Sequence, residues 1–162
     1  MHGKQFLLDA VYAGVDEQFL YGRLDFIGGV PDMSCDLVVN VESRKPGSSS
    51  THRELRVDAL MEQKILRDWS VTNPQSGTQI VNAGQSDKSP VQLALKKVFE
   101  FRLPLEWLCA PMASNGPVAD HLRVRVSLWH DRLPVDALPV EGWIELHLVS
   151  EAELLSGVSF GS

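Results

Sequence analysis

Residues 51–69 read THRELRVDALMEQKILRDW, and two kinds of secondary structure compete for them. Thr51 and Glu54 have the spacing of a helix capping box, which favours a helix. The odd positions from 55 to 69, however, are mostly apolar, and the even positions between them are mostly charged. A period of two is typical of a half-buried strand, so the segment is predicted to form two strands with a bend near Glu62 and Gln63.

Alternating stretches and mainly apolar runs, separated by turn signals, predict the other elements of the chain. Residues 7–15 and 19–26 are predicted to form a hairpin in which Leu20, Leu24 and Phe26 share one face. The other predicted elements are a buried strand at 35–41, a long and mostly irregular connection at 72–90 with one short strand near Ile80, a single strand at 91–103 that Pro104 ends, a helical turn at 105–108 and a loop at 110–118.

Residues 121–129 and 143–149 are the last strong pair of predicted strands. Their apolar positions form one layer, in which Leu122, Val124, Val126 and Leu128 face Ile144, Leu146 and Leu148. Ser150 and Glu153 are predicted to cap a terminal turn.

Eight or nine short strands with turn signals between them predict an all-β fold. The expected architecture is a two-sheet antiparallel β-sandwich of the immunoglobulin-like or carbohydrate-binding-module-like type, with at most one or two short helical turns. A closed barrel is the second choice. The length of 162 residues is enough for one complete core, so residues 1–162 are predicted to form a single domain.

Composition and charge limit the expected partners and the compartment. The chain carries 15 Lys and Arg against 21 Asp and Glu, a net charge of −6. This balance argues against nucleic acid or an anionic membrane as the main partner, because both reward basic patches. The residues after Met1 lack the pattern of a secretory signal, and Cys35 and Cys109 have no metal-binding or disulfide spacing, so a cytoplasmic location with free thiols is expected.

The sequence contains none of the motifs that carry common reactions, such as GxGxxG, GxxxxGK[ST], HExxH or GxSxG. The five histidines have no ligand-like spacing, and the neighbouring acidic residues are explained by turns and caps. We therefore expect no catalytic residue, no metal and no cofactor, and thus a domain that is not an enzyme.

Two tryptophans give the most informative surface prediction. If Trp129 lies opposite Trp143, then Arg125 and Glu145 share their face, away from the apolar layer. Two indoles with a guanidinium and a carboxylate suit a sugar ring, so these four residues are the predicted carbohydrate-binding site. The alternative is that the indoles pack under a loop, such as the connection 131–141, or against another domain. Trp69 and Trp107 are predicted to be core residues.

Three stretches resemble a known family. Residues 1–16, MHGKQFLLDAVYAGVD, together with FLYGRLDF at 19–26, resemble the C-terminal region of bacterial glycoside hydrolase family 57 proteins, and LPVDALPVEGWIEL at 133–146 resembles the end of the same proteins. The hairpin and FEFRLPL at 99–105 are also similar to family 9 carbohydrate-binding modules and DOMON-type domains.

This resemblance implies a non-catalytic accessory domain beside a catalytic barrel, whose catalytic Glu and Asp lie outside this chain. Such a domain would bind an α-glucan or related oligosaccharide, or stabilise the barrel. A second hypothesis is a stand-alone protein–protein interaction module that uses residues 72–90 or an exposed strand edge.

Overall fold

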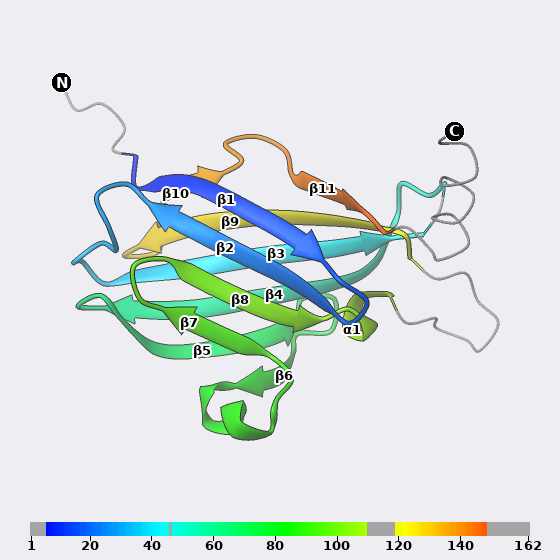
Figure 1. Ribbon diagram of the computed structural model, residues 1–162, viewed down its shortest axis with the longest axis horizontal. Helices are drawn as coiled ribbons and strands as arrows, with labels where there is room; N and C mark the ends of the chain where they lie inside the picture. Colours follow the sequence, from blue (N-terminus) through cyan, green and yellow to red (C-terminus); the bar gives the residue numbers. More distant parts are fainter. Residues whose placement is uncertain (1–5, 46, 110–118, 149–162) are drawn as a thin grey trace, which may run out of the picture.

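The computed structural model describes residues 6–45, 47–109 and 119–148, and strands dominate them (Figure 1). The strands are β1 (Leu8–Val15), β2 (Phe19–Phe26), β3 (Cys35–Arg44), β4 (Thr51–Glu62), β5 (Ile65–Asn73), β6 (Thr78–Asn82), β7 (Gln92–Leu95), β8 (Phe99–Pro104), β9 (His121–His130), β10 (Leu133–Leu138) and β11 (Ile144–His147). A 3-10 helix, η1 (Ala83–Lys88), and a helical turn, α1 (Glu106–Cys109), complete the list.

These strands form two antiparallel sheets that pack face to face. The small sheet has the order β1-β2-β8-β7, and the large sheet has the order β10-β9-β3-β4-β5-β6 with β11 also paired to β9. The predicted all-β sandwich is confirmed. Within the described ranges, no helix has the length and apolar content needed to cross a membrane.

Alternation explains how the core is built. Every second residue of the central strands points inward, because successive side chains of a strand lie on opposite faces. The inner layer of the large sheet includes Leu37, Val39, Val41, Leu55, Val57, Ala59, Val124 and Val126, and the small sheet contributes Leu20, Leu24, Phe99, Phe101 and Leu103.

The strand interpretation of residues 51–69 is confirmed. Gln63 and Lys64 form the bend between β4 and β5, with φ of 52° and 64°. Trp69 is buried in the core, as predicted, whereas Trp107 is only partly buried and packs against the core.

The prediction of one strand over residues 91–103 is wrong. The segment is a hairpin of β7 and β8, and the Lys96 N–H closes its turn by donating to the Val98 carbonyl, at 3.1 Å. The apolar positions before and after the turn are all odd-numbered, so the alternation keeps its phase across the break and only Lys97 interrupts it.

The predicted pairing of Trp129 with Trp143 is also wrong. Ile144 lies opposite Val124, four residues away from the expected register, and β10 takes the place beside the Trp129 end of β9. A shift by an even number of residues keeps each side chain on its predicted face, so the apolar layer is correct although the partners are not. Residues 131–141 thus contain an edge strand, β10, which pairs with the Trp129 end of β9.

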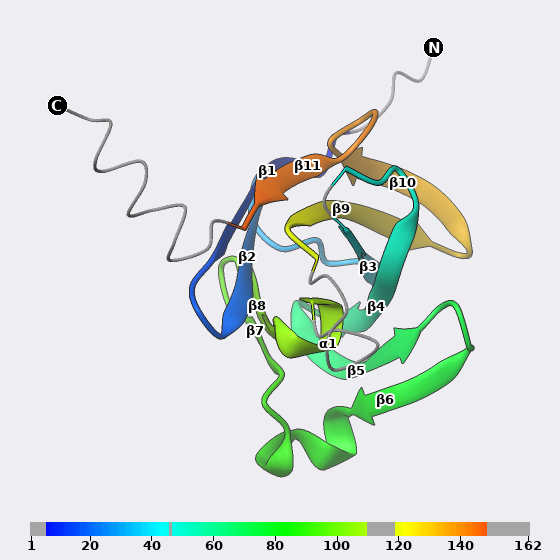
Figure 2. The ribbon, with the colours of Figure 1, turned by 90° about the vertical axis from the view of Figure 1, so that its right-hand side faces the viewer.

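Strand β1 of the small sheet passes close to β10 and β11 of the large sheet (Figure 2). A buried carboxylate joins the two sheets there. Asp136 Oδ2 accepts the backbone N–H groups of Leu7 and Leu8, both at 2.9 Å, and Oδ1 accepts the N–H of Ala137 at 2.8 Å. The first two bonds satisfy N–H groups at the start of β1, which is an edge strand of the small sheet. The predicted loop at 110–118 and the predicted cap at Ser150 and Glu153 lie outside the described residues.

Candidate functional site

The two predicted site tryptophans have different surroundings. Trp129 is half-buried near the end of β9, opposite Pro134, and its Nε1–H donates to Ser127 Oγ at 2.9 Å. Trp143 is half-buried just before β11, with the Arg123 guanidinium 4.6 Å from the ring centroid. The register brings Trp143 level with Arg125, which is four residues, or about 13 Å of strand, from Trp129. The expected indole pair is not formed.

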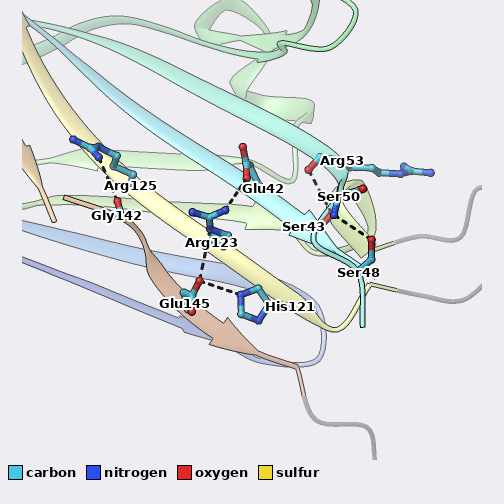
Figure 3. A network of polar contacts seen from close by, with 10 residues as sticks. All are labelled: Glu42, Ser43, Ser48, Ser50, Arg53, His121, Arg123, Arg125, Gly142 and Glu145. Atoms are coloured by element: carbon cyan, nitrogen blue, oxygen red, sulfur yellow. Dashed lines mark hydrogen bonds and ion pairs between the residues drawn. The ribbon is translucent and has the colours of Figure 1, made fainter. Parts of the chain in front are cut away.

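The other two predicted site residues hold the local structure together (Figure 3). Arg125 donates to the carbonyls of Val140 at 3.2 Å and Gly142 at 3.3 Å, and so holds the loop between β10 and β11. Glu145 lies 3.7 Å from Arg123 and 3.6 Å from His121. Both charged groups therefore already have partners within the sheet.

Exposed aromatic rings gather instead on the outer face of the small sheet. Tyr12 of β1 is 56% exposed and Tyr21 of β2 is 41% exposed. Tyr12 lies opposite Arg23, and Tyr21 lies opposite Gly14. The sequence contained a signal for this face, because the alternation that turns Leu20 and Leu24 inward must turn Tyr21 outward.

These side chains border a shallow pocket of about 410 Å³ that crosses all four strands, which we call the tyrosine trough. Two rows of residues form its walls, about 7 Å apart because they are two residues apart along each strand. The first row is Tyr12, Arg23, Glu100 and Ala94; the second row is Gly14, Tyr21, Arg102 and Gln92; the floor is the strand backbone at Ala13, Gly22, Phe101 and Leu93.

The Tyr21 ring is held by the turn that precedes β2. Its hydroxyl donates to Asp16 Oδ2 at 2.9 Å, and Asp16 Oδ1 accepts the N–H groups of Gln18 and Phe19, each at 2.7 Å. The two backbone bonds lower the pKa of Asp16, and the bond to Asp16 raises the pKa of Tyr21.

The two arginines of the trough are also held by neighbours. Arg23 binds Asp25 through two nitrogens, at 2.8 and 3.2 Å, and its guanidinium lies 5.7 Å from the Tyr12 ring centroid. Arg102 donates to the Pro90 carbonyl at 3.3 and 3.2 Å and lies 4.2 Å from the Phe19 ring centroid. The trough is thus lined by ordered side chains.

The described residues offer little for metal or thiol chemistry. No group of three His, Cys, Asp or Glu side chains among them is placed to hold a metal ion. Cys35 and Cys109 are buried free thiols. Burial raises the pKa of both, that of Cys109 to about 11, so neither is an activated thiolate.

The trough therefore offers two exposed phenol rings together with guanidinium, carboxylate and amide groups on one open face. Aromatic rings can pack on the apolar faces of a ligand, and planar polar groups can bind its hydroxyls. Comparison of the chain with protein-family models, with curated proteins and with solved structures finds no match.

Proposed function

We propose that the chain is a non-catalytic β-sandwich domain that binds an α-glucan or a related oligosaccharide in the tyrosine trough. The observation that carries the proposal is the exposure of Tyr12 and Tyr21 on a face that also holds Arg23, Arg102 and Glu100. A sugar ring has an apolar face that stacks on an aromatic ring and hydroxyls at its rim that charged planar groups bind.

The order within the trough supports binding. Fixing a free side chain on a ligand costs about 0.5–1.5 kcal/mol in rotamer freedom. Tyr21, Arg23 and Arg102 are already held by Asp16, Asp25 and Pro90, so most of this cost is met in the free protein. An open face with ordered aromatic and polar side chains suits a ligand, such as an oligosaccharide, that binds through many weak contacts.

The wider role rests on the sequence resemblance. We take the domain to be an accessory part of a cytoplasmic family 57-type glycoside hydrolase, which brings glycan to the catalytic barrel or stabilises it. The barrel would then supply the chemistry, and this chain would supply only binding.

One feature favours the alternative of a protein–protein interaction module. β6 is an edge strand of the large sheet, and Ile80 at its centre is 40% exposed. An extended peptide could add to this edge through backbone hydrogen bonds. The trough contributes nothing to that mode, so the two functions make different predictions for trough variants.

Calorimetric titration of the chain with maltohexaose, glycogen and mannan tests the proposal. The Tyr12→Ala/Tyr21→Ala variant should bind at least about tenfold more weakly, which corresponds to about 1.4 kcal/mol. The Trp129→Ala/Trp143→Ala variant is the matched control with the same number of lost aromatic rings, and it should keep its affinity. Saturable binding that is lost only in the tryptophan variant would show that the binding site lies at β9 and not in the trough. The absence of binding up to millimolar sugar would overturn the proposal.

A further inference from the structure

Gly14 lies inside strand β1, and no backbone requirement explains a glycine there. Its φ is not among the positive values that favour glycine, and the register shift in β1 is at Leu8 and Ala10, away from it. A Cβ built at Gly14 meets no atom within 4 Å. The position therefore has room for a Cβ atom.

The contrast with Gly22 on the neighbouring strand is informative. A Cβ at Gly22 would come within 2.0 Å of the Phe101 ring, so packing in the core requires that glycine. No packing contact of this kind requires a glycine at position 14. A glycine inside a strand weakens it, and where no bulge or bend needs it, it commonly marks a site where a ligand approaches the backbone closely.

The position of Gly14 fits this explanation. It ends the second row of the trough, directly opposite Tyr21. Side chains of opposite residues in an antiparallel pair start only about 5 Å apart. A side chain at Gly14 would therefore stand beside the Tyr21 ring and cover it from the β1 side.

The charges of the trough limit the ligand further. Arg23 is neutralised by Asp25, Arg102 is bound to the Pro90 carbonyl, and Glu100 adds a negative charge. The carbonyl leaves the positive charge of Arg102 in place, but the negative charge of Glu100 matches it, so the described trough has no excess positive charge to balance a carboxylate or phosphate.

From these observations, and resting on the proposed function, we infer that Gly14 is the position at which a ligand ring reaches Tyr21, and that the trough selects uncharged saccharides. Gly14 is thus a specificity-determining residue: its missing side chain leaves room for the sugar. A larger residue there keeps the fold and closes the site.

The test combines one substitution with two ligands. Gly14→Val should fold normally, because valine suits a strand and its Cβ meets no other atom, and it should bind maltohexaose at least tenfold more weakly than the wild type. Ala10→Val is the matched control, since it adds a β-branched side chain to the same face of β1 outside the trough. Gly14→Ala should give a smaller loss, and circular dichroism verifies the fold of each variant.

The outcomes separate the two proposals. If the wild type binds neither maltohexaose nor the other neutral glycans, the proposed function fails and this inference fails with it. If the wild type binds and Gly14→Val binds equally well, only the role of Gly14 is overturned. If a hexameric oligogalacturonate binds as tightly as maltohexaose, the selection of uncharged saccharides is wrong.

Discussion

Replacing Gly22 with alanine should destabilise the sandwich, although one methyl group is the whole change. The new Cβ would lie 2.0 and 2.1 Å from two carbons of the Phe101 ring, whereas carbon atoms pack at about 3.5–4.0 Å. Phe101 is only 3% exposed, so its ring must move against other core side chains. Overpacking of this kind costs about 1–3 kcal/mol. The lower entropy of the unfolded alanine chain offsets about 0.4–1 kcal/mol, which leaves a net loss of about 1–2 kcal/mol.

Thermal and urea unfolding, followed by circular dichroism, measure this loss. At about 2–4 °C per kcal/mol for a chain of this size, Tm should fall by about 2–8 °C. Gly14→Ala is the control on the paired strand, and it should be neutral or slightly stabilising because nothing meets its Cβ. Phe101→Leu, introduced into the Gly22→Ala background, should cost less than it does alone. Equal Tm values for Gly22→Ala and Gly14→Ala would refute the packing argument.

Four further predictions concern ionisable groups. Asp136→Ala leaves three backbone donors without their carboxylate and should lower the free energy of unfolding in urea by at least about 2 kcal/mol, while Asp136→Asn, which keeps an acceptor oxygen, should cost less. In an ultraviolet titration Tyr21 should ionise above its ordinary pKa of 10.0, and Asp16→Asn should return it toward that value. The lowered pKa of Asp16 means that its contribution to stability is present above pH 3.8 and is lost as the pH falls through the folded value; a loss on raising the pH instead would contradict this sign. The Cys109 thiol, with a pKa of about 11, should react with a disulfide reagent at neutral pH far more slowly in the native chain than in urea, and equal rates would show that it is accessible.

Alternation allowed most of the strands to be predicted, because one buried face imposes a period of two on the sequence. Strands β2, β4 and β5 carry that pattern, whereas the predictions of β1 and β3 rested on mainly apolar runs between turn signals. Alternation does not show, however, which residues of two neighbouring strands lie opposite each other. Alternation assigns each residue to a face, and any even shift satisfies it, so Ile144 could be placed on the correct face and still be given the wrong partner on β9.

β10 was missed for a different reason. Pro134 argues against a strand, and Asp136 reads as a solvent-exposed residue, although it is buried and binds the backbone of β1. The backbone N–H groups that Asp136 accepts belong partly to β1, which only the tertiary structure brings near, so the local sequence pattern cannot reveal this role. The same limit applies to the site: the predicted hairpin brings Arg23 of β2 beside Tyr12, but Glu100 and Arg102 come from β8, which is distant in sequence.

The lengths of the outermost strands have a consequence for how the protein behaves at high concentration. On one side of the molecule the edge strands of the two sheets are β6, with five residues, and β7, with four. On the other side the Asp136 carboxylate occupies donors at the start of β1. Aggregation by edge-to-edge pairing of β-strands between molecules requires long edge strands with unpaired backbone N–H and C=O groups. Edge strands as short as β6 and β7 offer few of them, so we expect the folded chain to resist this route to aggregation on that side of the molecule.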